Sequence, residues 1–196
     1  MRVIAGKFRG RRLATVPPGV RPTSDRLRES LFNVLGTSVP GSYWVDLFAG
    51  TGAVGIEALS RGARFVLFNE RDIRAYRCLR RNLELCGIAE GFQALRKDAL
   101  GLAGQLSSAE PADFVFVDPP YAFKGYQRLF QLLAQSPVVG EETLVLLEVF
   151  KKQSLDFLGS AWEELRRIEA GDSILFILRK SERPVEKTEP PVKSSN

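Results

Sequence analysis

Short apolar runs alternate with helical patterns from residue 43 onward, and this alternation limits the choice of fold more than any other feature. The sequence predicts five buried strands, over residues 44–48, 65–68, 92–96, 114–117 and 143–147. Helical patterns separate most of them, over residues 53–60, 72–85 and 126–133. Apolar strands that alternate with helices are typical of a mostly parallel sheet with helices on both faces. We therefore expect a doubly wound α/β fold that binds ligands at the carboxyl ends of its strands.

We place this α/β domain at residues 37–180. Residues 162–169 and 174–178 predict an antiparallel hairpin that closes the sheet, although the first of these segments is also compatible with a helix. Residues 181–196 combine prolines, serines and charges and contain no aromatic residue, so we expect a disordered tail.

The first part of the chain, residues 1–36, has a different pattern. It predicts a short β-hairpin over residues 1–16 and then a helix that Thr23 or Ser24 caps and that ends near Gly36. Residues 1–28 contain eight basic residues and one acidic residue, a net charge of +7 that leaves −2 on the other 168 residues. A basic segment on a near-neutral body suggests a polyanionic partner. The alternative explanation is a solvated arm whose charges only keep the protein soluble.

The residue types that the chain lacks exclude several kinds of chemistry. The 196 residues contain no histidine and only two cysteines. A Ser-His-Asp triad, a histidine general base and a histidine metal site are therefore impossible, and two thiols are too few for a four-thiolate zinc site. We predict no metal. Catalysis has to rely on carboxylates, backbone groups, aromatic rings, lysine or arginine, or on a reactive cofactor.

Hydropathy gives no sign of a membrane segment. No apolar run approaches the roughly 20 residues that span a bilayer, and the first eight residues lack the apolar stretch of a secretory signal. We expect a cytoplasmic monomer with no membrane partner.

A glycine-rich turn links the first predicted strand to the helix after it. Gly50, Gly52 and Gly55 match the pattern G-x-G-x-x-G, in which glycines permit a tight turn and let a ligand approach the backbone. Glu70 lies twenty residues after Gly50, at the end of the second strand, where a carboxylate can accept hydrogen bonds from both hydroxyls of a ribose. Asp72 is the rival for this role, although its position suggests a helix N-cap.

These features suit a nicotinamide cofactor as well as other nucleoside ligands, and Asp46 helps to choose between them. It lies four residues before Gly50, where its carboxylate would repel a pyrophosphate and attract an ammonium group. The chain also shows no separate substrate domain. S-adenosylmethionine has a ribose and an amino-acid end but no phosphate. We therefore predict it as the cofactor, with S-adenosylhomocysteine as the product.

The sequence Asp118-Pro119-Pro120-Tyr121 directly follows the fourth predicted strand. Two prolines stiffen the loop and remove two amide donors, which leaves a carboxylate, outward-facing carbonyl groups and an aromatic ring. This set can accept hydrogen bonds from a planar NH₂ group and stack on the base that carries it. We predict these four residues as catalytic. The alternative is a proline-rich turn with a core tyrosine.

A further carboxylate, Asp98, ends the third predicted strand. It can accept a hydrogen bond from an adenine amine, while the backbone N–H of Ala99 donates to the adenine ring. The predicted cofactor-binding residues are Asp46, Phe48, Gly50, Thr51, Gly52, Glu70, Arg71, Asp98 and Ala99.

These motifs, in this order, resemble the bacterial 16S ribosomal RNA guanine-N2 methyltransferases, the RsmD-like family. Residues 2–6 and 10–13 resemble the opening of that family, and residues 21–33 resemble its most characteristic segment. The glycine turn and residues 118–121 are shared with many amino-methyltransferases, including DNA adenine enzymes. The N-terminal part is therefore the specific part of a resemblance that extends to residue 180.

The resemblance implies a Rossmann-like, class I S-adenosylmethionine-dependent methyltransferase. It also implies methyl transfer to the exocyclic N2 of a guanine in 16S ribosomal RNA, with the RNA or an assembly intermediate of the small ribosomal subunit as partner. Residues 148–150 depart from the family, since similar proteins often carry a more polar triplet there. The predicted RNA contacts are Arg9, Arg11, Arg12, Arg21, Thr23, Arg26 and Arg28.

Three alternatives remain open at this point. A DNA adenine-N6 methyltransferase shares the catalytic logic but usually needs a larger target-recognition region. A nicotinamide-dependent oxidoreductase shares the glycine turn. A non-catalytic RNA-binding protein shares the basic segment, but the intact motif at residues 118–121 counts against it.

Overall fold

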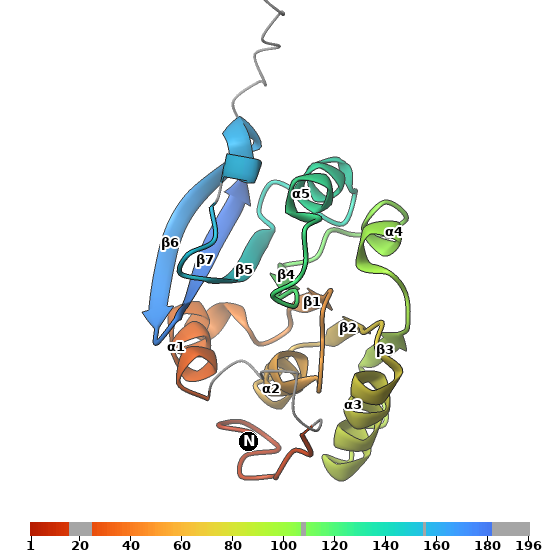
Figure 1. Ribbon diagram of the computed structural model, residues 1–196. Coiled ribbons are helices and arrows are strands. Elements are labelled where there is room, and N and C mark those ends of the chain that lie inside the picture. The colour runs from red at the N-terminus through yellow and green to blue at the C-terminus, as the bar shows by residue number, and fades with distance from the viewer. Residues whose placement is uncertain (16–24, 107–108, 155, 182–196) are drawn as a thin grey trace, which may run out of the picture.

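A seven-stranded sheet forms the centre of the computed structural model, which describes residues 1–15, 25–106, 109–154 and 156–181 (Figure 1). The strand order is β3-β2-β1-β4-β5-β7-β6, with β1 to β5 parallel and the last two strands antiparallel to their neighbours. This is the Rossmann-like sheet with a closing antiparallel hairpin that the sequence predicts. The strands are β1 (Tyr43–Asp46), β2 (Phe65–Asn69), β3 (Phe92–Leu95), β4 (Phe114–Val117), β5 (Leu144–Phe150), β6 (Trp162–Ala170) and β7 (Ser173–Lys180).

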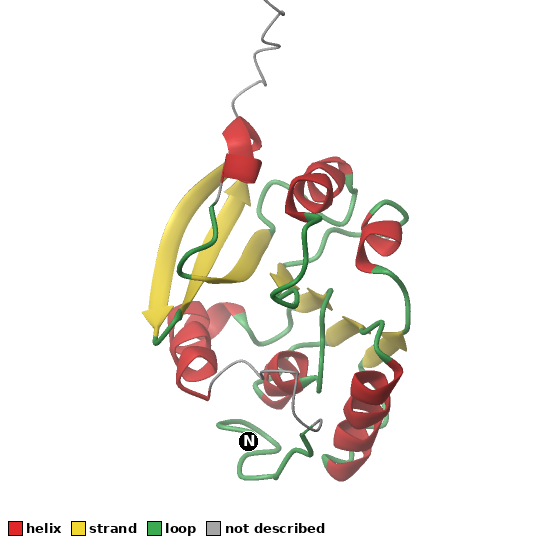
Figure 2. Ribbon diagram, in the orientation of Figure 1, coloured by secondary structure: helices red, strands yellow, loops and turns green. Residues whose placement is uncertain are grey.

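Helices cover both faces of the sheet, as Figure 2 shows. Apolar residues of α1, α2 and α3 pack with Trp44, Phe68 and Phe116 on one face. Residues of α4 and α5 pack with Val45 and Val115 on the other face. Because successive strand residues point to opposite faces, each central strand contributes to both cores. The helices are α1 (Asp25–Leu35), η1 (Gly36–Ser38), α2 (Ala53–Ser60), α3 (Ile73–Leu85), α4 (Ala99–Ala103), α5 (Tyr126–Gln135) and η2 (Asp156–Ala161).

Several elements differ from the sequence prediction. β5 ends three residues later than predicted, because the antiparallel ladder with β7 continues to the pair Phe150–Ser173. α4 and η2 were not predicted, since five or six residues are too few for a recognisable helical period. The segment that was compatible with either strand or helix is a strand, β6, at the edge of the sheet.

The N-terminal segment is a hairpin-shaped loop with one antiparallel bridge, between Arg2 and Arg12. Val3, Phe8 and Leu13 are buried in the same core as α1 and α2. The basic residues of this segment therefore belong to a loop that is docked on the domain, and their side chains are exposed on it.

Two side chains of α2 hold this loop in place. The carboxylate of Glu57 accepts hydrogen bonds from the backbone N–H groups of Ile4 and Ala5, at 2.8 and 3.0 Å. The hydroxyl of Ser60 accepts one from the N–H of Phe8 at 2.9 Å. A fully buried carboxylate requires such donors, so the hydrogen bonds from the loop account for the burial of Glu57.

The predicted RNA contact at Arg28 is wrong. Its side chain is fully buried, and it donates to the backbone oxygen of Arg2 at 2.6 Å and to Asp25 at 3.0 Å, with Glu57 at 3.8 Å. Burial lowers the pKa of this guanidinium, and the two carboxylates oppose that shift. Arg28 therefore links α1 to the N-terminal loop and α2 and cannot reach an RNA phosphate. The predicted caps Thr23 and Ser24 and the tail from residue 182 lie outside the described residues.

Two glycines of the loop provide a matched test of its docking. Gly6 and Gly10 both have left-handed backbones, with φ of 80° and 83°. A methyl group on Gly6 would collide with the backbone carbonyl of Ser60, whereas one on Gly10 meets no atom within 4 Å in the described structure. Gly10→Ala should cost about 1–2 kcal/mol of unfolding free energy from its backbone alone. Gly6→Ala should cost about 1–3 kcal/mol more, because of the collision. Urea unfolding of both variants measures this difference, and equal losses would show that the loop is not tightly docked.

Candidate active site

A cavity of about 1330 Å³ opens at the carboxyl ends of the central strands. Its walls come from segments that are far apart in the sequence, as a ligand site of a doubly wound sheet requires. Of the predicted catalytic and cofactor-binding residues, Gly52 alone does not line it. The predicted residues that do are Asp46, Phe48, Gly50, Thr51, Glu70, Arg71, Asp98, Ala99, Asp118, Pro119, Pro120 and Tyr121.

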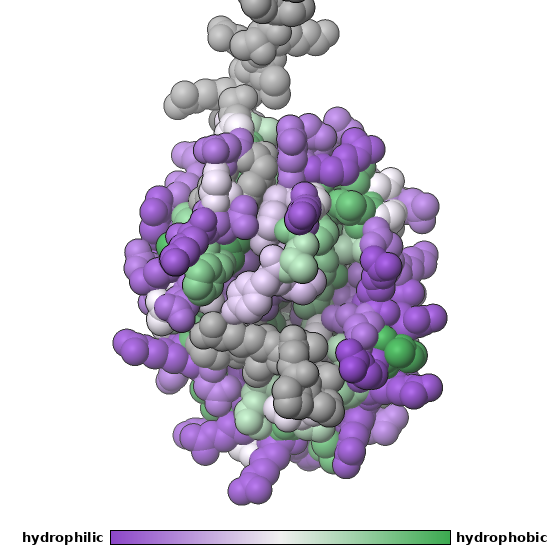
Figure 3. Space-filling view, in the orientation of Figure 1, coloured by the Kyte–Doolittle hydropathy of each residue, from purple (hydrophilic) through white to green (hydrophobic). Residues whose placement is uncertain are grey.

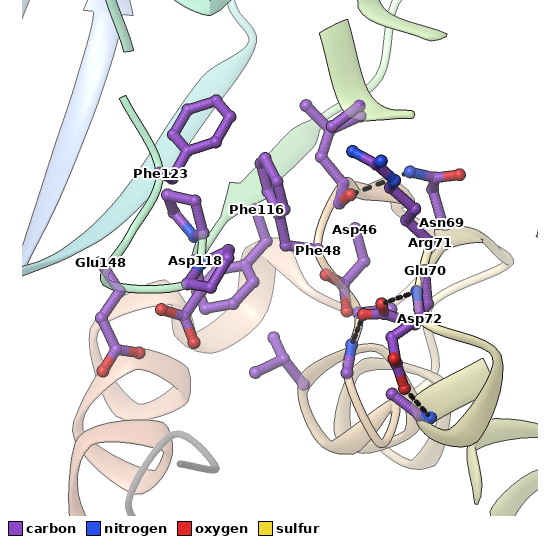
Figure 4. Close-up of a pocket in the computed structure, with 18 of the residues that line it drawn as sticks. Asp46, Phe48, Asn69, Glu70, Arg71, Asp72, Phe116, Asp118, Phe123 and Glu148 are labelled. Atoms are coloured by element: carbon purple, nitrogen blue, oxygen red, sulfur yellow. Dashed lines mark hydrogen bonds between the residues drawn. The ribbon is translucent and has the colours of Figure 1, made fainter. Parts of the chain in front are cut away.

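Four carboxylates reach this cavity from one face of the sheet. Asp46 of β1 pairs with Phe68 of β2 and with Phe116 of β4. Two residues after each phenylalanine comes a carboxylate, Glu70 in the first case and Asp118 in the second. On β5, the residue paired with the phenylalanine of β4 is Leu146, and Glu148 follows it by two residues. Side chains two residues apart on a strand point the same way, so all four project to the side that α1, α2 and α3 cover. Figure 4 shows Asp46 and Glu70 together at one end of the cavity, and Asp118 with Glu148 at the other.

The glycine turn adopts the geometry that its sequence predicts. Gly50 and Gly52 have positive φ angles of 55° and 80°, which residues with a side chain rarely adopt. A Cβ atom on Gly52 would collide with Leu79, and one on Gly55 with the ring of Phe68. Gly52 and Gly55 thus allow α2 to pack closely against α3 and the sheet, while Gly50 leaves the backbone open toward the cavity.

Glu70 braces this turn. Its carboxylate accepts hydrogen bonds from the backbone N–H groups of Gly50, at 2.8 Å, and Asp72, at 2.7 Å. Burial raises the pKa of Glu70, and these N–H donors counteract the rise. Each oxygen keeps a lone pair for a further donor. The rival, Asp72, is the N-cap of α3 and accepts from Arg74 and Ala75. The geometry thus favours Glu70 as the ligand-binding carboxylate.

Asp46 is the most buried of the four carboxylates, with 1% of its surface exposed. Neither oxygen accepts a hydrogen bond of normal geometry from the described residues. Burial raises its pKa to about 8, and the charge of Glu70 adds to the rise, while the N–H groups of Phe48 and Gly55 favour the ionised form. A buried carboxylate without a good partner requires either a proton or a positively charged ligand.

Residues 118–121 form the opposite wall. The N–H of Phe123 donates to the carbonyl of Pro120 at 2.8 Å and closes the turn after the motif. The ring of Phe123 lies edge-to-face on Phe48, with centroids 5.3 Å apart. Tyr121 is 68% exposed, so the alternative of a core tyrosine is excluded. Its ring stands at the mouth of the cavity, where it can stack on an incoming base.

Asp98 has contacts that the sequence did not suggest. One carboxylate oxygen caps α4 by accepting from Leu100 and Gly101, and the other lies 3.2 Å from Arg71. A ligand amine would have to share these oxygens.

Among the residues of the cavity wall that were not predicted as site residues, Asn69 and Glu148 have polar side chains in informative positions. Asn69 joins three strand ends, since its side chain bonds the carbonyl of Leu47 and both backbone groups of Lys97. Glu148 lines the cavity beside Asp118. Aligning the predicted strands in parallel would have found Glu148, because it lies two residues after the position on β5 that is level with Asp46.

The remaining predicted RNA contacts lie outside the cavity. Arg9, Arg11, Arg12 and Arg26 are exposed, and Arg11 donates to the backbone oxygen of Leu85 at 2.8 Å. Arg21 and Thr23 lie outside the described residues. Hydrophilic side chains line the rim of the molecular face that Figure 3 shows. In the described parts of the chain, no cluster of three or more possible metal ligands occurs. The described helices include none that is long and apolar enough to cross a membrane.

Comparisons with known proteins agree with this fold. The model of the family described as Conserved hypothetical protein 95 matches residues 1–179. Ribosomal RNA small subunit methyltransferase D of Escherichia coli K12 is 35% identical over 173 residues, 87% of this chain and 85% of the relative. The protein of the same name from Haemophilus influenzae is 36% identical over 157 residues, 79% of this chain and 81% of the relative. The solved structure of Escherichia coli yhhF superimposes with a TM-score of 0.80, at 30% identity, over 93% of this chain and 99% of that one. The chain therefore belongs to the Conserved hypothetical protein 95 family, that of the ribosomal RNA small subunit methyltransferases D.

Proposed function

We propose that this protein transfers a methyl group from S-adenosylmethionine to the exocyclic N2 of a guanine in 16S ribosomal RNA. One observation carries the proposal: a single cavity has a buried and a half-buried carboxylate, Asp46 and Glu70, at one end and the loop of residues 118–121 at the other. The first pair suits an amino-acid and ribose ligand, and the loop suits a base that carries an NH₂ group. The names of the family members support ribosomal RNA of the small subunit as the substrate.

The residues at the first end fit the proposed methyl donor. Asp46 has two buried oxygens that an ammonium group would satisfy, and Glu70 has lone pairs left for the hydroxyls of a ribose. The sulfonium group of S-adenosylmethionine supplies an electrophilic methyl group. The protein therefore needs no activated nucleophile of its own, which is consistent with a chain that contains no histidine.

At the other end, Asp118 and the carbonyl of Pro119 would hold the guanine amine. This amine is a poor nucleophile because its lone pair is delocalised into the ring. Two acceptors that bind its hydrogens would direct the lone pair toward the methyl group, and Tyr121 would stack on the extruded base. Most of the rate enhancement would come from this positioning, and the amine need not lose a proton before it attacks. As the bond between N2 and the methyl carbon formed, the bond from that carbon to sulfur would break and S-adenosylhomocysteine would leave. The methylated amine would then pass its surplus proton to the carboxylate of Asp118 or to water.

The alternatives differ from the proposal at identifiable points. A nicotinamide cofactor would bring its pyrophosphate close to Asp46, where a buried carboxylate disfavours it. A DNA adenine methyltransferase would use the same loop on a different nucleic acid. Methyl transfer from labelled S-adenosylmethionine to undermethylated ribosomal RNA, in parallel with DNA, decides between these functions. Label in the DNA alone would reject the proposal.

Asp118→Asn is the direct test of the catalytic loop. The change keeps the size of the side chain but turns one acceptor oxygen into a donor that faces the substrate amine. We expect a loss of about 2–4 kcal/mol of transition-state stabilisation, as when one preorganised polar contact is removed. This corresponds to a fall in turnover of about 30- to 1000-fold. Affinity for S-adenosylmethionine, measured by calorimetry, should stay close to that of the wild type. Turnover within threefold of the wild type would refute the catalytic role.

Two neighbouring carboxylates allow a matched test of cofactor binding. Glu70→Ala removes the predicted ribose contacts, and we expect S-adenosylhomocysteine to bind at least about tenfold more weakly. Asp72→Ala removes the cap of α3 and should instead lower stability by about 1 kcal/mol, with little change in binding. Calorimetric titration and thermal unfolding of both variants measure these effects. The reverse pattern would assign the ribose to Asp72.

The exposed arginines of the N-terminal loop provide a test of RNA binding. Deleting the loop would remove part of the core, so point variants are required. If Arg9 and Arg12 each contact one phosphate, Arg9→Gln/Arg12→Gln should flatten the slope of log affinity against log salt by roughly 1.5. The exposed residues Arg128 and Arg166, on α5 and β6, provide a control variant with the same loss of charge. Filter binding at four salt concentrations measures each slope, and parallel lines for all three proteins would exclude the loop as an RNA contact.

A further inference from the structure

The carboxyl end of β5 carries a carboxylate that the proposed reaction does not use. Glu148 lines the cavity and has only 8% of its surface exposed. In the parallel pair of β4 and β5, Val117 lies opposite Leu147, so the next residues, Asp118 and Glu148, are neighbours on the same face. Figure 4 shows both carboxylates in the same part of the cavity. A group held by Asp118 would therefore also lie close to Glu148.

Aromatic side chains make this part of the cavity suitable for a flat group. Phe150 follows Glu148 by two residues and points to the same side of the sheet. Its ring meets Tyr121 edge-to-face, with centroids 5.9 Å apart. Phe116, two residues before Asp118, also lines the cavity. A base that enters past the exposed Tyr121 would thus present its edge to two carboxylates.

We propose that Glu148 determines the specificity for guanine, by accepting a hydrogen bond from the N1–H of the base whose N2 amine Asp118 holds. This inference rests on the proposed function. Guanine carries two donors side by side on its Watson–Crick edge, N1–H and the N2 amine. Neighbouring strands lie about 4.8 Å apart, so the carboxylates that follow β4 and end β5 can present an acceptor to each of these donors.

The same arrangement discriminates against other bases that carry an amine. Adenine and cytosine have a bare ring nitrogen beside their amine, and its lone pair would face an oxygen of Glu148 with no proton between them. A site that is built to bind a substrate N–H strongly rejects an analogue that lacks it, because its buried polar group is then left unpaired. Glu148 would therefore select the base, and Asp118 would orient the amine that reacts.

2-Aminopurine separates these two roles, because it keeps the N2 amine of guanine but has an acceptor in place of N1–H. The methylated position is first mapped in ribosomal RNA, and RNAs with guanine or 2-aminopurine at that position are made by ligation. The wild-type enzyme should prefer guanine by at least about 100-fold in kcat/KM. Glu148→Gln has an amide that can donate to the bare ring nitrogen. It should therefore lower the ratio of guanine to 2-aminopurine by at least about tenfold.

The ratio distinguishes specificity from damage to the fold, because a structural defect would slow both substrates equally. Glu142→Gln, an exposed glutamate just before the same strand, is the matched control and should leave the ratio unchanged. An unchanged ratio in Glu148→Gln, or comparable wild-type rates on the two RNAs, would overturn this inference while the proposed function stands. Failure of the wild-type enzyme to methylate guanine in the RNA would overturn the proposed function and this inference with it.

Discussion

The parallel register of β1 with its two neighbours determines where Asp46, Glu70 and Asp118 lie. Asp46 is paired with Phe68 on one side and with Phe116 on the other. A shift of one residue in either pair would turn Glu70 or Asp118 to the opposite face, because strand side chains alternate with a period of two. The apolar residues of the same strands resist such a shift, since it would also exchange the two cores. The same strand register thus fixes both the packing of the sheet and the geometry of the site.

This constraint places charged groups where an apolar residue would be more stable. Burial disfavours an ionised carboxylate, and the pKa of Asp46 is raised to about 8. A folded-state pKa above the unfolded value of about 3.9 means that the stability from this group is fully present below pH 4 and is lost as the pH rises through 8. A cationic ligand would reverse that loss, because it favours the ionised form. The position of Asp46 is therefore costly for folding alone and useful for binding.

The parts of this picture that the sequence predicts are those with a local signal. Gly50 and Glu70 form a motif of fixed spacing, and Asp118 ends an apolar strand beside two prolines. The missed features depend on distant partners. α4 is a single short turn that Asp98 caps, and Glu148 acquires its place only through the register of β5. The burial of Arg28 depends on Glu57 of α2 and on the backbone of Arg2, which adjoins it only after the N-terminal loop has docked.

Six carboxylates line the described part of the site, four of them on one face of the sheet, together with a proline-rich loop and four basic side chains. In the proposed reaction these acceptors would bind the donors of the ligands, namely an ammonium group, ribose hydroxyls and the N–H groups of a base. It provides no histidine for proton transfer, since the chain has none. A reaction in which the donor molecule carries its own electrophilic methyl group needs none, because orientation of the amine is the main task left to the protein. The lack of histidine and the alignment of carboxylates on one face of the sheet therefore point to the same chemistry.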